Sequence, residues 1–325
     1  MVTGEGDGVS GLGGGTLAAL RMAGLDPRDV ARAVRAALDE DFAYGPDVTS
    51  GATVAGRTVT ADVVAREAGV LAGVPVALAV LDLIGGYADQ GDLSGPSEAV
   101  ALVAEGARIG AGDAVLRVSG PAPAVLGAER TMLNFLTHLS GIATATRAWA
   151  DVIEGTGAAV RDTRKTTPGL RVLDKYAVRC GGGRNHRMGL GDAALVKDNH
   201  VAAAGGVAAA VTAVRAAAAA RSGSAGSAAG AGLVVEVECD SVAQVREALD
   251  AGAHFLLLDN MPLSSLREAV AVAHDYYGVR LEASGGLRLE NAREVAQTGV
   301  DYLAVGALTH SSRALDLGLD YADEG

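Results

Sequence analysis

The stretch FLLLDNMPLSSLREAVAVAHDYYGVRLEAS, residues 255–284, contains the alternation that decides the fold. An apolar run from Phe255 ends in the carboxylate of Asp259, and a segment with helical spacing, Leu263 to Tyr277, follows it. A second apolar run, Val279 to Ser284, ends in a hydroxyl. Short apolar runs indicate buried strands, and strands that alternate with helices predict βα units in a parallel sheet.

The same rhythm recurs through the second half of the chain. Further strands are expected at 158–162, 193–197, 233–238 and 302–306, and further helices at 241–251 and 289–298. In an α/β barrel, functional residues lie at the C-terminal ends of the strands. The residues at these ends are Asp162, Lys197, Glu238, Asp259, Ser284 and Gly306. A doubly wound open sheet is the alternative, although no GxGxxG motif follows a first strand to favour it.

The first half of the chain has a different pattern. Residues 1–24 are rich in glycine and are expected to form a disordered tail. Asp26 followed by Pro27 predicts the start of a helix. Apolar runs between Arg57 and Val118, cut by glycines, predict a β-rich domain with one helix near 74–84.

Two longer segments are expected to contain helix. Residues 123–154 predict a long helix with a break at Ser140-Gly141. The Ala-, Gly- and Ser-rich segment 215–232 predicts a lengthened helix end followed by a flexible loop, without a functional role.

Charge is distributed unevenly along the chain of 325 residues. The net charge of −12 argues against a nucleic-acid-binding protein that works through a basic face. Residues 161–187 nevertheless carry eight Lys or Arg against two Asp, a net of +6. A basic island in an acidic protein indicates a focused site for a small anion.

Composition narrows the class of protein further. With 49% hydrophobic and only 3% aromatic residues, the core must be aliphatic, which is typical of parallel sheets and barrels. The two cysteines, Cys180 and Cys239, have neither zinc spacing nor a disulfide framework, which is compatible with a reducing cytoplasm. We expect no signal peptide at residues 1–20 and no membrane span.

The basic island contains two kinds of cation. Arg164, Lys165, His186 and Arg187 adjoin a strand end or the glycine turn 181–183, where cations favour an anion site. The other basic residues are equally compatible with a solvated helix face. They are Arg171, Lys175, Arg179 and Arg184.

Two further groups follow predicted strands. Glu238 and Asp259 end strands one βα unit apart, where they can share a divalent cation or accept hydrogen bonds from sugar hydroxyls. The alternative is that both cap the helices that follow. The loops at 284–286 and 306, with glycines that open onto helices, predict a phosphate site near His310.

The segment 162–200 resembles the signature of the quinolinate phosphoribosyltransferases. The matching stretches are DTRKTTPGLR (162–171), KYAV (175–178), GGGRNHR (181–187) and GLGDAALVKDNH (189–200). The resemblance extends over nearly everything from about residue 26 onward. It implies an α/β protein with an incomplete barrel of about seven strands at 133–310, preceded by an open-faced α/β sandwich domain at 25–132. Residues 311–325 would return to the N-terminal domain.

The resemblance also implies an activity. Members of the family transfer the phosphoribosyl group of phosphoribosyl pyrophosphate to quinolinate with decarboxylation, giving nicotinate mononucleotide, pyrophosphate and CO₂ in de novo NAD biosynthesis. The residues that match the family's quinolinate pocket are Arg130, Thr163, Arg164, His186, Arg187 and Lys197. Those that match its phosphoribosyl pyrophosphate site are Lys165, Glu238, Asp259, Ser284, Gly285, Gly286, Gly306 and His310. The catalytic positions would be Lys165, Lys197, Glu238 and Asp259, with Glu238 and Asp259 also holding Mg²⁺.

Family resemblance further implies a cytoplasmic homodimer or a larger dimer-based assembly, in which Arg130 reaches into the partner's site. Neither nucleic acid nor membrane is an expected partner. One rival is a nicotinate phosphoribosyltransferase, or a relative from molybdenum-uptake operons with altered specificity; the many cations favour the dianion quinolinate. A rival of another class is a non-catalytic phosphate- or nucleotide-binding regulator, which the presence of both Glu238 and Asp259 disfavours.

Overall fold

The computed structural model describes residues 9–90, 93, 95, 97–222 and 233–322. The chain divides into two compact units. We call Ala148–Lys165 and Gly183–Ala307 the barrel unit, and Met1–Arg147, Thr166–Gly182 and Leu308–Gly325 the sandwich unit.

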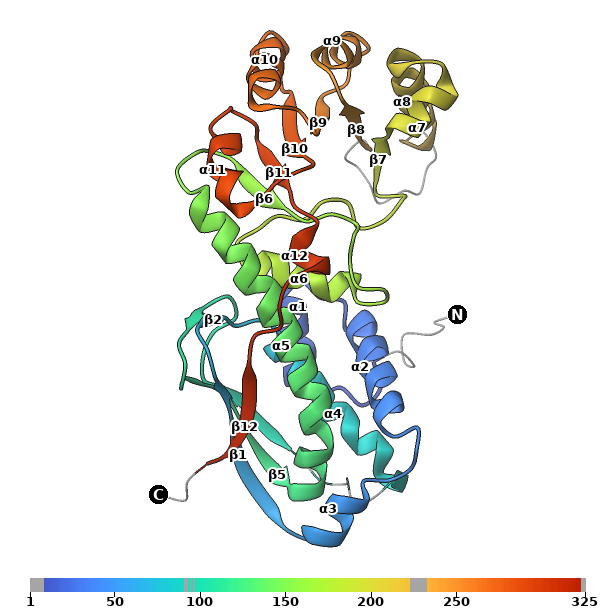
Figure 1. Cartoon of the computed structure of the whole chain (residues 1–325). Coiled ribbons are helices and arrows are strands. Elements are labelled where there is room, and N and C mark those ends of the chain that lie inside the picture. The colour runs from blue at the N-terminus through green and yellow to red at the C-terminus, as the bar shows by residue number, and fades with distance from the viewer. Residues whose placement is uncertain (1–8, 91–92, 94, 96, 223–232, 323–325) are drawn as a thin grey trace. The chain divides into compact units, whose positions relative to one another are not determined.

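The barrel unit contains a parallel sheet, seen with its helices in Figure 1. Its strands are β6 (Ala159–Arg161), β7 (Ala193–Val196), β8 (Val234–Cys239), β9 (Phe255–Asp259), β10 (Arg280–Ser284) and β11 (Tyr302–Ala304). The spatial order is β6-β11-β10-β9-β8-β7. A single parallel bridge joins Arg161 to Arg184, so the segment before β7 adds one residue beside β6. The incomplete barrel is confirmed, with six strands in the described residues and a seventh position reduced to this bridge.

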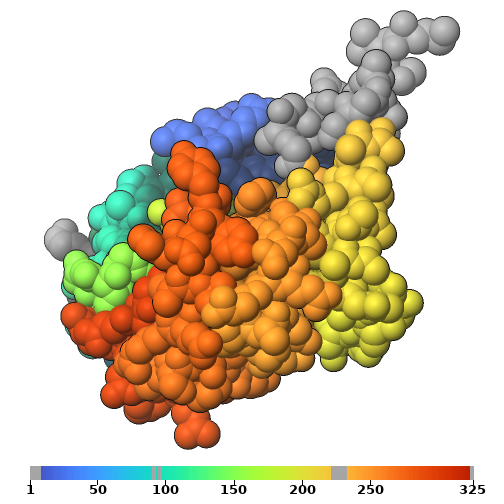
Figure 2. Space-filling view, turned by 90° about the horizontal axis from the view of Figure 1, so that it is seen from above, coloured from blue at the N-terminus to red at the C-terminus, as the bar shows by residue number. Residues whose placement is uncertain are grey.

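Helices pack along the outside of this sheet. They are α7 (Asp198–Ala204), α8 (Val207–Ser222), α9 (Val242–Asp250), α10 (Leu263–Ala273) and α11 (Leu289–Ala296). The inner face of α10 consists of Leu266, Ala269 and Val272, at helical spacing and all buried. Figure 2 shows α8, α9 and α10 side by side on the surface, coloured from yellow to orange. The helices thus cover the outer face of the sheet.

The sandwich unit is built on an antiparallel sheet of order β12-β1-β5-β3. Its strands are β1 (Thr58–Ala65), β3 (Glu98–Ala101), β5 (Ala114–Pro121) and β12 (Leu317–Tyr321), with a separate pair of β2 (Gly69–Val70) and β4 (Arg108–Ile109). The helical elements are α1 (Gly14–Met22), α2 (Pro27–Asp41), α3 (Val48–Thr53), α4 (Val74–Leu83), η1 (Ile84–Gln90), α5 (Ala122–Val152), α6 (Arg171–Cys180) and α12 (Ala307–His310). Two of them cross the division: α5 and α12 each have residues in both units.

Several helix and strand boundaries follow local chemistry that the sequence already displays. Helix α2 begins after Asp26, whose side chain accepts a hydrogen bond from Arg28 N–H, with Pro27 at the first helical position.

At the other end of the chain, β12 pairs antiparallel with β1, so that Leu319 lies opposite Val63.

Two expectations are wrong in detail. Residues 14–22 form helix α1, because Leu20 is fully buried there, so the disordered tail does not extend to residue 24; residues 1–8 lie outside the described part. Helix α5 does not break at Ser140-Gly141. Ser140 exchanges hydrogen bonds with the backbone of Ala72, and a Cβ on Gly141 would lie 2.2 Å from Arg313 O, so both residues serve close packing.

The division into units also differs from the expected boundaries. Residues 133–147 and 166–182 belong to the sandwich unit, because most of α5 and all of α6 pack there. Helix α8 extends the expected helix to Ser222, and the loop expected after it, 223–232, lies outside the described residues. No single helix in the described ranges is long and apolar enough to cross a membrane, although the bent pair 198–204 and 207–220 meets that test by length and composition.

Candidate active site

Parallel pairing brings the C-terminal ends of the barrel strands to one edge of the sheet. Ser284 is in register with Asp259, and Glu238 lies opposite Leu257 one strand further on. Most of the predicted site residues therefore belong to the barrel unit. They are Thr163, Arg164, Lys165, His186, Arg187, Lys197, Glu238, Asp259, Ser284, Gly285, Gly286 and Gly306. Arg130, exposed on α5, and His310, at the end of α12, belong to the sandwich unit.

Two arginines at this edge are partly buried and close enough to affect each other. The Nε atoms of Arg164 and Arg187 are both buried and have no hydrogen-bond partner among the described residues. Arg187 donates from Nη1 to Ala193 O at 3.1 Å. Burial lowers the pKa of Arg187, and the neighbouring Arg164 guanidinium lowers it further. Two like charges, each with an unused and buried Nε donor, form a strong receptor for an anion.

The loop that carries Arg164 is organised by its neighbours. Thr163 Oγ1 accepts a hydrogen bond from Lys165 N–H at 3.0 Å. Asp162, fully buried at the end of β6, accepts one from His186 N–H at 2.8 Å. Asp162 thus ties the segment after β6 to the segment that carries His186 and Arg187.

His186 is buried and held through both ring nitrogens. Its Nδ1 accepts from Arg187 N–H at 2.7 Å, so the ring proton lies on Nε2, which is 2.9 Å from Glu236 Oε2. Hydrogen-bond capacity of the imidazole is therefore used within the chain. The side chain fixes the backbone of Arg187 rather than offering an open donor.

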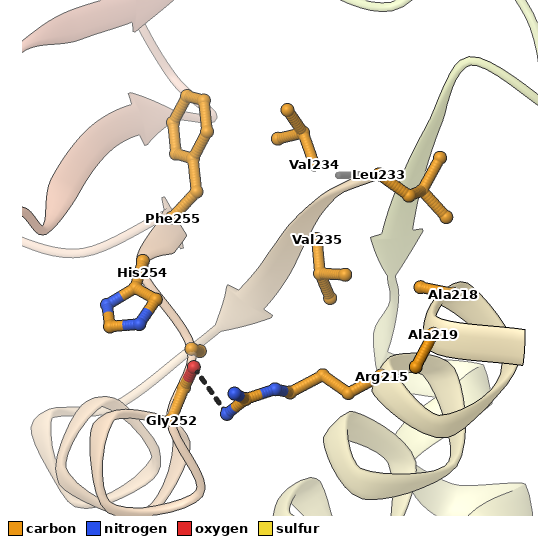
Figure 3. Close-up of a pocket in the computed structure, with 10 residues that line it drawn as sticks. Arg215, Ala218, Ala219, Leu233, Val234, Val235, Gly252, His254 and Phe255 are labelled. Atoms are coloured by element: carbon orange, nitrogen blue, oxygen red, sulfur yellow. Dashed lines mark hydrogen bonds between the residues drawn. The ribbon is translucent and has the colours of Figure 1, made fainter. Parts of the chain in front are cut away.

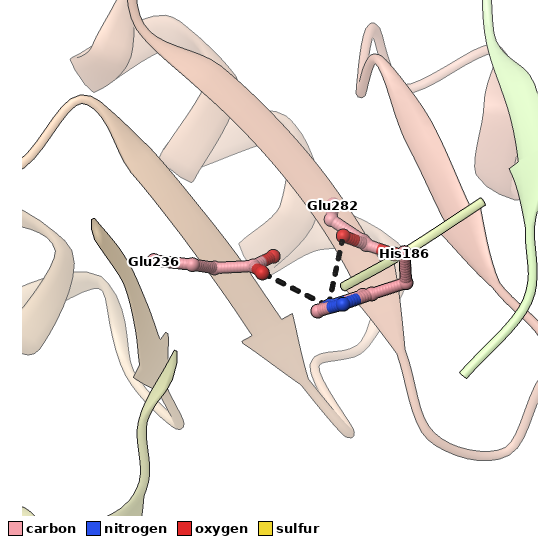
Figure 4. Close-up of side chains that lie close together, drawn as sticks. All are labelled: His186, Glu236 and Glu282. Carbon is pink, nitrogen blue, oxygen red and sulfur yellow. Dashed lines mark ion pairs between the residues drawn. The ribbon is translucent and has the colours of Figure 1, made fainter. Parts of the chain in front are cut away.

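His186 belongs to a buried group of charged side chains with Glu236 and Glu282, shown in Figure 4. His186 lies between Glu236 and Glu282, and Arg161 Nη1 donates to Glu282 Oε2 at 2.5 Å. The Arg161 guanidinium also lies 5.1 Å from the centroid of Phe255. These side chains point into the barrel from β6, β8 and β10, as alternate strands do in barrel interiors.

This environment shifts the pKa values of the two glutamates in opposite directions. Burial and the negative charge of Glu236 raise the pKa of Glu282 well above its ordinary value. Burial opposes ionisation of Glu236 too, but the hydrogen bonds from His186 and Glu282, together with nearby positive charge such as that of Arg161, outweigh it and the pKa of Glu236 is lowered. With Glu282 protonated, the positive charge of Arg161 balances the negative charge of Glu236. His186, Glu236 and Glu282 could geometrically hold a metal ion, but Arg161 already occupies the cation position.

A second carboxylate group lies at the strand ends. One oxygen each of Glu238, Asp240 and Asp259 lie within 4.8 Å of one another, and Lys197 Nζ is 3.0 Å from Glu238 Oε2. Three carboxylate oxygens suit a hard divalent cation such as Mg²⁺. Sequence analysis predicted Glu238 and Asp259 but missed Asp240. In the sequence, Asp240 comes directly before Ser241, the N-cap of α9, and therefore resembles part of a helix start rather than a site residue.

The loop after β10 contains two glycines of the predicted phosphate site. Gly285 and Gly286 both have positive φ, 80° and 61°, which other residues rarely adopt. Asn260, which sequence analysis did not single out, contacts this loop through its backbone and side chain.

A separate cavity lies at the opposite ends of the strands. Figure 3 shows its wall of Val234, Val235 and Phe255, with Arg215 hydrogen-bonded to Gly252 O at 2.9 Å. Its volume is about 420 Å³. Because it borders the N-terminal ends of β8 and β9, it is separate from the candidate site.

Comparison with known proteins decides the family. The model of the quinolinate phosphoribosyl transferase C-terminal domain matches residues 142–320, and that of the N-terminal domain matches residues 47–140. The chain belongs to the quinolinate phosphoribosyltransferase family. The expected membership of this family is therefore confirmed.

Individual members of the family match almost the whole chain. The nicotinate-nucleotide pyrophosphorylase [carboxylating] of Mycobacterium leprae is 52% identical over 296 residues, covering 90% of this chain and 97% of that protein. The probable nicotinate-nucleotide pyrophosphorylase [carboxylating] of Bacillus subtilis is 37% identical over 281 residues, covering 86% of this chain and 89% of that protein. The crystal structure of NadC from Streptococcus pyogenes superposes with a TM-score of 0.80 at 36% identity, covering 92% of this chain and 99% of that one. Both family domains are thus present in this chain.

Proposed function

We propose that this chain transfers the phosphoribosyl group of phosphoribosyl pyrophosphate to quinolinate, releasing pyrophosphate and CO₂ and forming nicotinate mononucleotide for NAD biosynthesis. The single observation that carries the proposal is the Arg164–Arg187 pair with its two buried, unpartnered Nε atoms. Quinolinate brings two adjacent carboxylates, and paired guanidinium groups match that charge and geometry. Family membership, and the names of relatives that match most of the chain, support the same reaction.

The quinolinate subsite is proposed to consist of Thr163, Arg164, Arg187 and Lys197, with His186 supporting Arg187 from below. Because both ring nitrogens of His186 are already hydrogen-bonded, its contact with quinolinate would be through the ring edge unless one bond is given up. A homodimer in which Arg130 enters the partner's site completes this proposal. The exposure of Arg130 on α5 supports it.

The phosphoribosyl pyrophosphate subsite is proposed to extend along the strand ends. Lys165 and Lys197 would face the pyrophosphate, Glu238 and Asp259 the ribose hydroxyls, and the loop at Ser284 the 5′-phosphate. Gly285, Gly286, Gly306 and His310 complete the proposed phosphate site. Mg²⁺ would be held by Glu238 and Asp259, with Asp240 close to both, and when bound it supplies charge stabilisation for the leaving pyrophosphate. Location in the cytoplasm is proposed from the two unpaired thiols.

The chain's own groups account for the chemistry in three parts. Arg164 and Arg187 hold the dianion so that the pyridine nitrogen faces the sugar C1, which converts a bimolecular step into a positioned one. Lysine charges stabilise the pyrophosphate as the C1–O bond breaks and C1 gains oxocarbenium character. The nitrogen lone pair then forms the new C–N bond. The pyridinium ring so formed accepts the electron pair from the adjacent C–CO₂⁻ bond, and a proton replaces the CO₂.

An assay that compares quinolinate with nicotinate as the substrate tests the proposal. Purified protein is supplied with phosphoribosyl pyrophosphate, Mg²⁺ and either quinolinate or nicotinate, and nicotinate mononucleotide is measured. We expect product from quinolinate and none from nicotinate. Arg164→Ala should raise the KM for quinolinate about 10- to 100-fold, as expected for loss of charged hydrogen bonds.

The matched control is Arg246→Ala, which removes an exposed arginine on α9 whose nearest carboxylate is 4.0 Å away. It should leave both KM values unchanged. Turnover of nicotinate alone, or an Arg164→Ala enzyme with normal quinolinate kinetics, would contradict the assignment.

A further inference from the structure

Asn260 has an unusual backbone conformation for its residue type. Its φ is 52°, and no other non-glycine residue of the described ranges has a positive φ. The left-handed region is unfavourable for side chains with a Cβ, although asparagine tolerates it better than most. Such conformations are retained where surrounding contacts require them, often at functional sites.

The contacts of Asn260 reach two neighbouring parts of the candidate site. Its side-chain Nδ2 donates to Asp259 Oδ2 at 2.7 Å, and its backbone N–H donates to Ser284 O at 2.9 Å. A Cβ on Gly285 would lie 2.2 Å from Asn260 Oδ1. The amide of Asn260 therefore lies directly against the Gly285 backbone, which explains why that position requires glycine.

The glycine loop borders a cavity of about 420 Å³ that Asn260 also lines, together with Leu263 and Leu266 of α10 and Val295 of α11. From the helix side, the Asn291 side chain reaches Gly286 O only at 3.4 Å, near the limit for a hydrogen bond. The bond from Asn260 N–H to Ser284 O, at 2.9 Å, is shorter. Asn260 therefore makes the closer contact with this loop.

We propose that Asn260 is a positioning residue that sets the distance between the Asp259 carboxylate and the phosphate loop at Ser284–Gly286. One carboxylate oxygen of Asp259 is held by the Asn260 amide, which leaves Oδ1 for a sugar hydroxyl or a cation. The same residue holds the loop that would bind the 5′-phosphate. A ligand that contacts both elements gains from this fixed spacing, because neither element must be ordered on binding. This inference rests on the proposed function.

Three substitutions separate the backbone role from the side-chain role. Asn260→Gly keeps the positive φ and removes the amide, whereas Asn260→Ala removes the amide and adds strain. Asn260→Asp keeps the shape but replaces the Nδ2 donor with an oxygen that repels Asp259. For Asn260→Gly we expect the KM for phosphoribosyl pyrophosphate to rise about tenfold, consistent with loss of one hydrogen bond, and the KM for quinolinate to stay within about twofold. Asn260→Asp should be impaired at least as much.

Direct binding supplies a readout that does not depend on turnover. Isothermal titration of the metal-free protein would compare ribose 5-phosphate, which spans both elements, with inorganic phosphate, which needs only the loop. We expect Asn260→Gly to weaken ribose 5-phosphate about tenfold and inorganic phosphate less than about threefold. Thermal unfolding of the variant should match that of the wild type, which excludes misfolding.

The results distinguish this inference from the proposed function. A wild-type protein that binds ribose 5-phosphate but does not turn over quinolinate refutes the function, and the titration still tests Asn260. If Asn260→Gly binds ribose 5-phosphate as tightly as the wild type, Asn260 has no positioning role, whatever the activity. Normal kinetics in Asn260→Gly with impairment only in Asn260→Ala would show that the residue matters for backbone strain alone and would overturn the inference.

Discussion

Glu282→Gln tests whether the buried carboxyl of Glu282 carries a proton in the folded protein. Glu282 is fully buried, and its pKa is raised well above 4.5 by burial and by the charge of Glu236. A glutamine amide has the shape of the protonated acid and still offers Oε1 to Arg161. At acidic pH the substitution should therefore change the free energy of unfolding by no more than about 1 kcal/mol.

The difference in free energy of unfolding between Glu282→Gln and the wild type should then change with pH in one direction. Above its ordinary pKa of 4.5, the unfolded Glu282 ionises while the folded carboxyl keeps its proton. The stability that Glu282 contributes is complete below that pH and is lost as pH rises toward the folded pKa. Glutamine is neutral throughout, so the variant should gain about 1.4 kcal/mol relative to the wild type for each pH unit in this window.

Urea unfolding followed by circular dichroism, at about pH 5 and about pH 7, measures the difference by linear extrapolation. Glu236→Gln is the matched control, because the pKa of Glu236 is lowered and its stabilising contribution is present above its ordinary value. That variant should lose about 1.5–3 kcal/mol near neutrality, and the loss should shrink as pH falls. If Glu282→Gln became less stable relative to the wild type as pH rose, Glu282 would be ionised and the charge assignment of the cluster would be refuted.

Two further predictions concern packing and thiol chemistry. Gly141→Ala places a Cβ 2.2 Å from Arg313 O and should lower the free energy of unfolding by about 1–3 kcal/mol in chemical denaturation, whereas the exposed Gly51 tolerates alanine with a change of less than about 1 kcal/mol. Burial raises the pKa of the Cys239 thiol to about 12, and burial with the Glu105 charge does the same for Cys180. Both should react with Ellman's reagent at least about 100-fold more slowly in the native protein near pH 8 than after denaturation, and fast labelling of either in the native state would contradict the burial.

The barrel strands could be predicted because their signal is local. Phe255–Asp259 coincides with β9, since an uninterrupted apolar run between a helix end and a polar residue has few other solutions. The basic residues of the site were visible for the same reason, as a dense cluster in one segment. Arg164 and Arg187 both lie within this segment, where Arg164 follows a predicted strand end and Arg187 follows the glycine turn 181–183.

Other features depend on contacts that no local pattern reveals. Helix α1 is weakly amphipathic, and its burial at Leu20 comes from tertiary packing. The charges of Arg161 and Glu282 look like interruptions of apolar strands, and only the barrel places them together. The proposed role of Asn260 rests on its positive φ and on its contact with Gly285. Neither can be deduced from the residue type alone.

Nearby carboxylates explain how Arg187 can remain charged beside Arg164 without a direct salt bridge to its Nε. Burial and Arg164 lower the pKa of Arg187, while the charges of Asp192 and Glu236 raise it. These carboxylates act at a distance: Glu236 bonds His186, and Asp192 accepts from Met188 N–H and Gly189 N–H. Their field stabilises the cation but leaves its Nε donor unused. A direct salt bridge would have stabilised Arg187 more and would have removed the donor that an incoming carboxylate needs.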